Sequence, residues 1–376
     1  MDFELSEEQL AVQGLAQQVL ATRFPQAGRM ADESWPDENL WRDLAQTGLV
    51  GLTLSEAVGG GSLGFVEMCL LLEECGRARA RTPLMEHLLA AMVIDRFGAD
   101  ALRQAVLSDA ASGEMLLTAA TTDRYGGDGL PGLSAIISAG GGYLLSGRQR
   151  LVAWGGTAKR IVVFATLDQH GDTICLLLNP ESEGVKLEFL ATTDGAPEAD
   201  LMCDGVQIGP NNVIAGPNQG GLARQWLWER LVVATCAQLA GLSATVLRLT
   251  AEYTSTREQF GRPIGTFQAV SMHAADAFIE VEGIRLAMLQ AAWRLDVGLD
   301  ASREVSIAKL AASEGAINVL AIANHLHGGV GLLKDYPLQQ YLTTTRRLAL
   351  AAGSAQWHLA RLGDMVAERA ELEVAA

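Results

Sequence analysis

The sequence has few positive charges, and this shortage excludes several classes of partner. Its 376 residues contain 28 Lys and Arg against 44 Asp and Glu, a formal net charge of −16. Binding to nucleic acid or to an anionic membrane surface needs an excess of positive charge. Neither partner is therefore expected. The acidic balance is typical of a soluble cytoplasmic protein, and it still allows a small anionic ligand held by a few local cations.

Cysteine, metal-binding clusters and targeting patterns are also scarce. The five cysteines form no CxxC pair, which favours buried free thiols in a reducing compartment. His325 and His327 are two residues apart with no third ligand at metal spacing, so no metal site is predicted. The acidic, amphipathic first twenty residues lack the basic start of a signal peptide. No stretch is judged long and apolar enough to span a bilayer, so we expect no membrane association.

The period of the apolar residues changes twice along the chain. Residues 1–115 show the 3–4 spacing of helices, residues 116–218 show short β-type runs separated by turn residues, and residues 219–376 return to long helical stripes. These blocks predict an α+β multi-domain fold. It comprises an N-terminal helical domain, a small antiparallel β domain and a C-terminal four-helix bundle.

One segment interrupts the longest helical region. It reads YTSTREQFGRPIGTFQAV, residues 253–270, and places Gly261 and Pro263 directly after Arg257 and Phe260. A helix end opened by Gly and Pro lets backbone groups approach a phosphate, and an arginine pairs with phosphate oxygens. The plainer alternative is a solvated charge at a helix end.

A second segment is rich in glycine. It reads HLHGGVGLLKDYPLQQYL, residues 325–342. Without a Cβ, Gly328, Gly329 and Gly331 allow a ligand close to the backbone. The plainer alternative is a helix C-cap and turn. His325 is either a hydrogen-bonding partner of a ligand or an ordinary interface histidine.

Together these two segments resemble the two signatures of the acyl-CoA dehydrogenase family, and the order of the blocks and the chain length resemble the family from end to end. The resemblance implies FAD between the β domain and the bundle, with its diphosphate and adenosine reaching a neighbouring subunit. By this resemblance, Arg257 contacts the diphosphate across the interface and Phe260 packs near the adenine. The whole cofactor-binding set that it implies is Arg257, Phe260, Gln268, His325, Gly328, Gly329, Trp154, Ser354 and Thr121.

The resemblance also implies a reaction, the removal of two hydrogens from Cα and Cβ of an acyl-CoA thioester. A carboxylate takes the α-proton while the β-hydrogen leaves as hydride to the flavin. The base must reach that proton and be desolvated enough to be basic. An electron-transfer flavoprotein is the electron acceptor that the resemblance implies.

The usual position of the base departs from the family pattern. Many members carry Glu–Gly–Thr/Ser there, whereas this chain reads Ala352–Gly353–Ser354, and alanine cannot abstract a proton. Other members place the base on the first bundle helix, at the position of Leu231 when counted back from Arg257. Glu229 is two residues away, about 200° around a helix. It is the candidate base, or else an exposed or salt-bridged residue.

Contacts from the β domain to the flavin also depart from the pattern. The usual Thr–Glu–Pro–x–x–Gly–Ser run becomes LTAATTDRYGGDG, in which Thr118, Thr121 and Thr122 are candidate contacts. The usual Trp–x–Thr/Ser contact becomes AWGGTA, where Trp154 remains and Gly156 replaces the hydroxyl residue. The residues that contact a subunit's own flavin thus differ from the family pattern, whereas the residues that contact a neighbouring subunit's flavin match it.

This asymmetry resembles bacterial acyl-CoA dehydrogenases that act on bulky CoA thioesters, including steroid side chains. In that subgroup two different chains form an α2β2 tetramer. Three hypotheses follow. The chain is a flavoenzyme subunit whose sister chain supplies the carboxylate, or a self-sufficient homodimer or homotetramer with Glu229 or another acid as base. The third is a catalytically dead scaffold that binds acyl-CoA or flavin.

Overall fold

Helices, strands and helices follow one another along the chain, as the sequence predicts. The computed structural model describes residues 3–23, 37–121, 131–167 and 171–375, with side chains up to residue 368. Contacts divide the chain into two compact units. The bundle unit contains Met1–Glu33, Phe65–Ala80 and Val232–Ala376, and the sheet unit contains Ser34–Gly64 and Arg81–Leu231. The three-domain division stays a prediction.

The sheet unit is built on one eight-stranded sheet with the order β6-β7-β3-β2-β4-β5-β8, and β1 pairs with β4. The sheet is mixed and not purely antiparallel as predicted, because β1 and β2 both run parallel to β4. Its strands are β1 (Leu117–Ala120), β2 (Leu133–Ile137), β3 (Tyr143–Ala153), β4 (Arg160–Leu167), β5 (Thr173–Leu178), β6 (Val185–Leu190), β7 (Glu198–Ile208) and β8 (Val213–Ala215).

Helices accompany this sheet within the same unit. They are α2 (Glu38–Gln46), α4 (Leu84–Phe97), α5 (Asp100–Ala111) and the first part of α6 (Pro217–Thr256). The inward face of the sheet is apolar: residues such as Leu145, Val163 and Leu201 are fully buried. Strand β3 changes register against β7 between Gln149 and Val152, which is a bulge in the middle of the unit.

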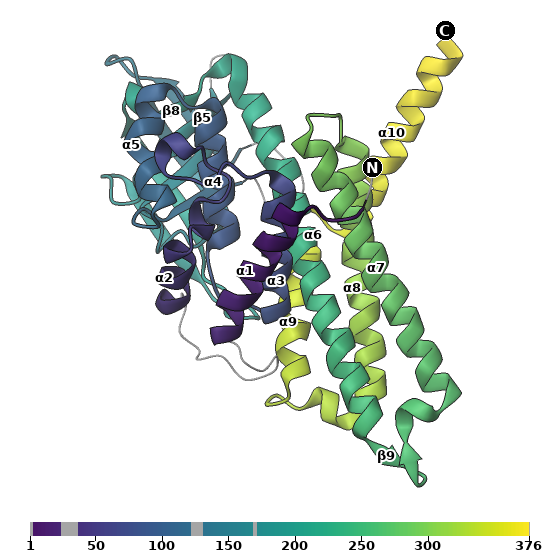
Figure 1. Cartoon of the computed structure of the whole chain (residues 1–376). Helices are drawn as coiled ribbons and strands as arrows, with labels where there is room; N and C mark the ends of the chain where they lie inside the picture. Colours follow the sequence, from purple (N-terminus) through teal and green to yellow (C-terminus); the bar gives the residue numbers. More distant parts are fainter. Residues whose placement is uncertain (1–2, 24–36, 122–130, 168–170, 376) are drawn as a thin grey trace. The chain divides into compact units, whose positions relative to one another are not determined.

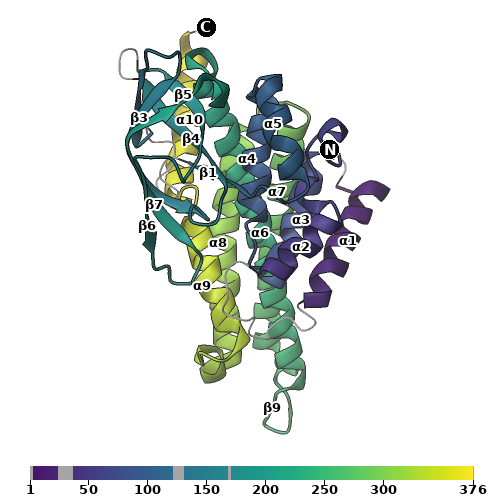
Figure 2. The ribbon, with the colours of Figure 1, turned by 90° about the vertical axis from the view of Figure 1, so that its left-hand side faces the viewer.

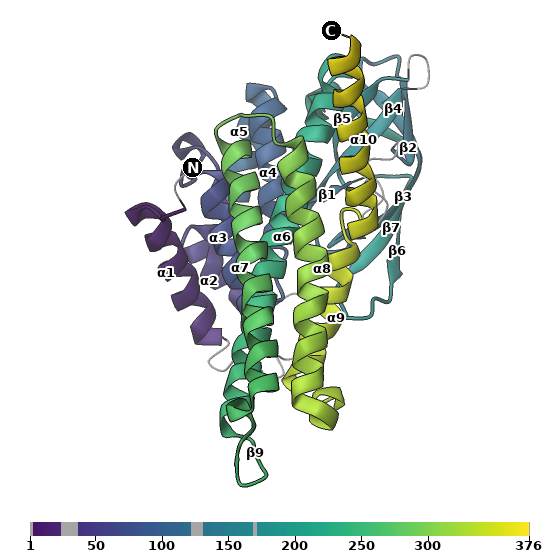
Figure 3. The ribbon, with the colours of Figure 1, turned by 90° about the vertical axis from the view of Figure 1, so that its right-hand side faces the viewer.

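In its described part, the bundle unit consists of helices joined by turns, with one short hairpin. Its helices are α1 (Glu7–Arg23), α3 (Phe65–Ala78), the second part of α6, α7 (Gln268–Asp296), α8 (Ser302–His327), α9 (Pro337–Leu350) and α10 (Ala355–Ala375). Helices α7 and α8 run side by side, with α9 and α10 against α8 and α3 against α7 (Figures 1 and 3). The five cysteines are free and buried, as predicted.

Two helices are longer and more apolar than the sequence analysis judged. Helix α6 and the segment Ser302–Leu332 both reach the length and composition of a membrane-spanning helix, so the expectation that no such stretch exists is wrong. Of the apolar window in α6, 83% is buried inside the protein, against 56% in the second segment. Burial in a protein core accounts for the apolar character of α6.

Helices α3 and α6 cross in direct backbone contact. A Cβ at Gly76 would overlap the carbonyl of Gln238, and a Cβ at Gly241 would overlap the carbonyl of Glu73. At the end of α3, the carbonyl of Arg77 accepts hydrogen bonds from Thr245 Oγ1 (2.9 Å) and Tyr341 OH (3.0 Å). Glycine on both helices is therefore a condition for this crossing.

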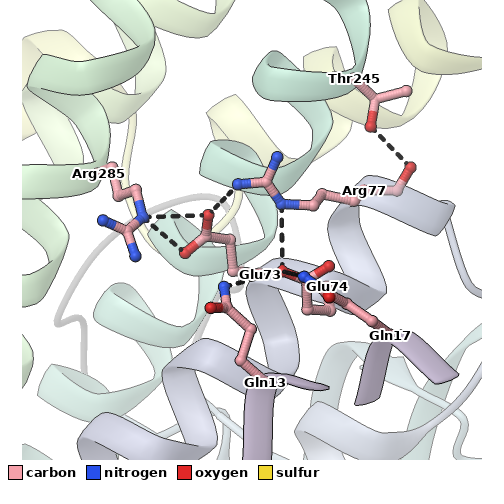
Figure 4. Close-up of polar contacts among 7 residues, drawn as sticks. All are labelled: Gln13, Gln17, Glu73, Glu74, Arg77, Thr245 and Arg285. Atoms are coloured by element: carbon pink, nitrogen blue, oxygen red, sulfur yellow. Dashed lines mark hydrogen bonds and ion pairs between the residues drawn. The ribbon is translucent and has the colours of Figure 1, made fainter. Parts of the chain in front are cut away.

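Buried charges surround the crossing (Figure 4). The fully buried Glu73 accepts hydrogen bonds from Arg77 on its own helix and from Arg285 Nε of α7 (3.2 Å). The neighbouring Glu74 accepts from two glutamines of α1 and pairs with Arg77, while burial raises the pKa of its carboxyl. Removing one partner of such a network leaves a buried charge uncompensated, so the network fixes α1, α3 and α7 in register.

Replacing Gly241 with alanine should strongly destabilise the protein. The added methyl cannot be accommodated without separating α3 from α6, and we expect a loss of about 1–3 kcal/mol in the free energy of unfolding, or more. Chemical denaturation followed by circular dichroism measures it. Gly14→Ala in α1 is the matched control, since nothing lies within 4 Å of its added Cβ. Equal stabilities of the two variants would contradict the crossing.

Candidate functional site

The interruption after α6 is a tight hairpin. Helix α6 ends at Thr256, and β9 (Glu258–Gln259) pairs antiparallel with β10 (Arg262–Pro263). The two turn residues, Phe260 and Gly261, have φ of +54° and +77°. Positive φ at both positions is what a type I′ turn requires. The hairpin lies at the lower end of the bundle unit in Figures 1 and 2, before α7 starts at Gln268.

The side chains of this hairpin point outward. Phe260 is 93% exposed, and its ring lies perpendicular to the Phe267 ring with centroids 6.1 Å apart. Within the described residues, the exposed guanidinium of Arg257 forms no ion pair or hydrogen bond. Gln268 is exposed as well. Arg257 and Phe260 are therefore both accessible to another molecule at the same hairpin.

Packing brings the second glycine-rich segment to the same place. Helix α8 ends at His327, and the ring of His327 stacks on Tyr253 of α6 with centroids 4.5 Å apart. Tyr253 OH donates to the backbone carbonyl of His327 (3.4 Å). The His325 ring contacts the His273 ring of α7 at 5.7 Å. The structure therefore unites both signatures in one site, which we call the bundle end: residues 253–268 and 325–332.

Glycine is present for different reasons at the three glycine positions of the bundle end. A Cβ at Gly331 would press on His327 and Asn324 inside the protein, and Gly328 has φ of +60°. Gly329 has neither reason, because its φ is not positive and nothing lies within 4 Å of an added Cβ. A glycine that its own chain does not require fits close approach by an external group. With the unpaired Arg257, these residues fit the diphosphate of FAD.

The junction between α9 and α10 holds the usual position of the base. Ala352 is buried with φ of +56°, and Gly353 has φ of +96°. Ser354 caps α10, since its Oγ accepts from the N–H of Trp357 (3.3 Å). His358 Nε2 donates to the carbonyl of Ala352 (3.0 Å). The junction is tightly held, and position 352 itself offers no carboxylate.

A buried lysine fastens the same junction from α8. Lys309 Nζ donates to Ser313 Oγ (2.7 Å) and to the carbonyls of Ala349 (2.8 Å) and Leu348 (3.3 Å). These carbonyls belong to the last turn of α9, where a cation is favourable. Burial lowers the pKa of Lys309 to about 8. The sequence analysis missed this residue, since a lysine within a helical stripe normally indicates a solvated side chain.

The sheet unit contains a cavity of its own. It has a volume of about 20 Å³, room for roughly one water molecule. Its lining is Glu86, Leu89, Ala119, Thr121, Leu151, Ala153, Leu227 and Leu231. Thr121 was singled out from the sequence; Thr122 lies outside the described residues. Leu231, the position counted back from Arg257, forms an apolar wall.

Glu229 does not line this cavity. It is half-buried, and its carboxylate accepts a hydrogen bond from Gln225 Nε2 (3.1 Å) on the preceding turn. Leu227 and Leu231, which do line the cavity, are each two residues away and thus on the other side of α6. The assignment of Glu229 as base stays a prediction.

Trp154, the flavin contact predicted from the sequence, lies outside the cavity, whereas Leu151 lines it. Trp154 is buried with φ of +59°, its N–H donates to the carbonyl of Pro197, and it is not part of the cavity lining. Leu151 and Ala153 do line the cavity. Residues two apart on a strand share one face, so both side chains point to the same side of the sheet; no pattern in the sequence singled them out.

Leu151 is held in place by a buried carboxylate. Its N–H donates to Asp200 Oδ1 (2.9 Å), and Arg148 donates to Oδ2. Burial alone would raise the pKa of Asp200, but the hydrogen bonds from Leu151 and Arg148 bring it below its usual value. This support keeps Leu151 at φ of +56° in the bulge of β3.

Backbone strain marks the same positions. Among the described residues, positive φ at non-glycine positions occurs at Ser62, Arg79, Leu151, Trp154, Phe260 and Ala352. Trp154, Phe260 and Ala352 were singled out from the sequence for flavin contact or for the base. Strained conformations of about 1–3 kcal/mol each persist where the surroundings enforce them, and they gather at functional sites.

Comparisons with known proteins identify the family. Residues 6–114 match the model of the acyl-CoA dehydrogenase N-terminal domain, and residues 223–367 match that of the acyl-CoA dehydrogenase C-terminal domain. The chain belongs to the acyl-CoA dehydrogenase family. The predicted fold, the FAD cofactor and the class of reaction, FAD-dependent dehydrogenation of acyl-CoA, are thereby confirmed.

Similar proteins include chains from heteromeric enzymes. Acyl-CoA dehydrogenase FadE27 of Mycobacterium tuberculosis is 33% identical over 380 residues, covering 98% of this chain and 99% of the relative. The crystal structure of the ChsE4-ChsE5 complex of the same organism matches with 31% identity and a TM-score of 0.87, covering 98% and 99%. A variant of the Tcur3481-Tcur3483 steroid dehydrogenase matches with 34% identity and a TM-score of 0.86, covering 97% and 99%.

Stability should fall on acidification because of His358. Burial lowers the pKa of its imidazole to about 4, so the unfolded chain takes up the proton near pH 6.5 while the folded chain does not. Between these values the unfolded state binds more protons, and stability decreases as the pH is lowered. We expect His358 to contribute roughly 2 kcal/mol of loss between pH 7 and pH 5.

Denaturation at both pH values of wild type and His358→Gln measures this contribution. Glutamine can still donate to the Ala352 carbonyl but does not titrate in this range. The difference between the two proteins cancels the similar contribution of His87, whose pKa burial also lowers to about 4. An identical pH dependence in both proteins is the outcome that would contradict the assignment.

Proposed function

We propose that this chain is the base-lacking subunit of a heteromeric acyl-CoA dehydrogenase. It contributes its bundle end to FAD that a sister chain binds, and the sister chain supplies the carboxylate. The observation that carries the proposal is Ala352, which occupies a rigidly held base position without a side chain able to take a proton.

The bundle end supports the first half of the proposal. Arg257, Phe260 and Gly329 are exposed there, and nothing within the described chain explains why a cation, an aromatic ring and an open glycine lie together. A surface of this kind is half of a site and needs a second protein to enclose the cofactor. Charge-assisted hydrogen bonds from Arg257 would balance the diphosphate charge.

The sheet unit supports the second half. Its cavity is lined by Leu231 at the position counted back for a base, where a carboxylate would be needed, and by Leu151 and Ala153 from β3. About one water fits, which is far too little for a flavin ring or a thioester. Glu86 is the one ionisable group of the lining, and it stands among apolar side chains.

The division of roles in the reaction follows from these contacts. Bound FAD supplies the acceptor for the hydride that leaves Cβ of the acyl thioester. In this chain Arg257 would neutralise the diphosphate, Phe260 would cover the adenine end against water, and Gly328 and Gly329 would admit the cofactor to the backbone. Ser354 caps α10 next to Ala352, so the junction is positioned without taking part in proton transfer.

The relatives suggest the substrate class. A steroid dehydrogenase and a two-chain complex are among the similar structures, and we infer a bulky, steroid-type CoA thioester for this enzyme. An electron-transfer flavoprotein as acceptor, an α2β2 assembly and a cytoplasmic location belong to the same proposal. A catalytically dead scaffold is not favoured, because the chain resembles dehydrogenases over almost its entire length.

The chain purified alone should contain little flavin. We expect well under one FAD per protomer in its absorption spectrum, because only half of the site is present. Co-expression with a paralogue that carries an intact Glu–Gly–Thr run should restore stoichiometric FAD, bleached by acyl-CoA. Near-stoichiometric flavin that bleaches in the lone chain would instead mean a self-sufficient enzyme.

Within the co-expressed complex, Arg257→Ala should weaken FAD binding about 10- to 100-fold, the value of a charge-assisted hydrogen bond. Flavin fluorescence during titration of the deflavinated complex measures this affinity. Arg303→Ala is the matched control, since Arg303 is an exposed arginine in the first turn of α8, outside the bundle end. Glu229→Gln should leave turnover within about twofold, and a loss of 100-fold or more would place the base on Glu229.

A further inference from the structure

The ring of Phe189 lies where a side chain of residue 156 would project. Phe189 belongs to β6, which lies at one end of the sheet, and it is 70% exposed. A Cβ added to Gly156 would lie 2.3 Å from its Cε1 and 2.8 Å from its Cζ. A larger residue at position 156 would therefore overlap the ring. Position 156 is also where the Trp–x–Thr/Ser run of the family carries a hydroxyl that contacts the flavin, and this chain has glycine there.

Strand pairing fixes the direction in which Phe189 points. Strands β3, β7 and β6 lie side by side (Figure 3), with Phe189 directly opposite Ala199 of β7. Ala199 is in turn directly opposite Val152 of β3. Side chains of directly opposite residues share one face of a sheet, and Ala199 and Val152 are buried. Phe189 thus faces the core side of the sheet, yet nothing in the described part of the chain covers it there.

Leu187 contacts the same turn as Phe189. It precedes Phe189 by two residues and is therefore on the same face of β6. Its Cδ2 lies 3.6 Å from a Cβ added to Gly155. Two side chains of one strand thus lie against the turn of residues 154–157, which directly follows β3.

Backbone hydrogen bonds hold this turn in place. The N–H of Trp154 donates to the carbonyl of Pro197 (2.9 Å). The carbonyl of Trp154 accepts from the N–H groups of Thr157 and Ala158, both at 3.0 Å. These bonds anchor the turn to the start of β7 and keep position 156 beside the Phe189 ring.

Hydroxyl groups close to the turn are used within the sheet unit. Thr157 Oγ1 donates to the carbonyl of Trp154 (3.3 Å). Thr118, a candidate flavin contact from the sequence, is fully buried, and its Oγ1 donates to the carbonyl of Ala153 (2.7 Å). Neither hydroxyl therefore substitutes for the one that is missing at position 156.

We propose that Phe189 and Gly156 together close this chain's own flavin site, with the phenyl ring in the place of the family's hydroxyl side chain. The inference rests on the proposed heteromeric function and deepens it, since it names the pair of residues that keeps this chain from binding a flavin ring itself. Glycine removes a hydrogen bond to the ring, and the phenylalanine fills the space beside it.

Riboflavin is the probe, because it carries the flavin ring without the diphosphate and adenine assigned to the bundle end. Its fluorescence during titration with the lone chain measures the apparent Kd. Gly156→Thr/Phe189→Ala should bind riboflavin about tenfold tighter than wild type, the value of one regained hydrogen bond, or more. The φ of Gly156 is not positive, so threonine is compatible with the backbone. Gly156→Ala/Phe189→Ala opens the space without a hydroxyl and should gain less.

Gly156→Thr/Ile137→Ala is the matched control. Ile137 is 60% exposed in the same sheet, but it pairs with Tyr143 at the start of β3, whereas the turn follows the end of β3. This variant should bind riboflavin no better than wild type, because the Phe189 ring remains in place. Circular dichroism checks that each variant is folded.

Three results would overturn the inference. They are equal riboflavin binding by wild type and Gly156→Thr/Phe189→Ala, an equal gain in the Ile137→Ala control, and an equal gain with alanine at position 156. Each can occur while the lone chain still contains little FAD, in which case the heteromeric function stands. Stoichiometric FAD in the lone wild-type chain would contradict the heteromeric function itself.

Discussion

The crossing of α3 and α6 is the constraint on which the bundle unit depends. Gly76 and Gly241 allow backbone to touch backbone, and this contact brings Glu73 into the interior, where Arg77 and Arg285 must neutralise it. Arg285 in turn fixes the rotation of α7, and α7 begins directly after the hairpin that presents Arg257 and Phe260. The close contact of α3 and α6, which Gly76 and Gly241 permit, is thus connected through the buried Glu73 to the orientation of α7 and of the bundle end.

The candidate functional residues fall into two groups that differ in how firmly the surrounding protein holds them. Those of the α9–α10 junction are held from several sides, by Lys309, Ser313 and His358, although position 352 has no reactive group. Those of the bundle end are held from the inside, where Tyr253 stacks on His327 and His325 contacts His273, while Arg257 and Phe260 are exposed. A sister chain would explain both observations. It would supply the carboxylate that position 352 lacks, and it would cover the exposed bundle end.

Much of the candidate site could be predicted because its residues are close in sequence or belong to recognisable runs. The interruption of the helix follows from Gly261 and Pro263, whose backbone properties interrupt any helix, although the hairpin itself was not predicted. The loss of the base follows from a single letter, Ala352. In contrast, the place of Leu151 in the cavity could not be predicted from the sequence. It depends on a bulge in β3, where the N–H of Leu151 donates to Asp200 on the neighbouring strand β7.

The sequence by itself determined the order of helical and β blocks, the two signatures, the family and the absence of a carboxylate at position 352. These properties are local, since they depend on residue type, period and spacing along the chain. Only the tertiary structure decided that β1 and β2 run parallel to β4, that Lys309 is buried beneath a helix end, and that Gly329 has an open face. Each of these depends on contacts between segments far apart in sequence, and no local pattern of residues records such contacts.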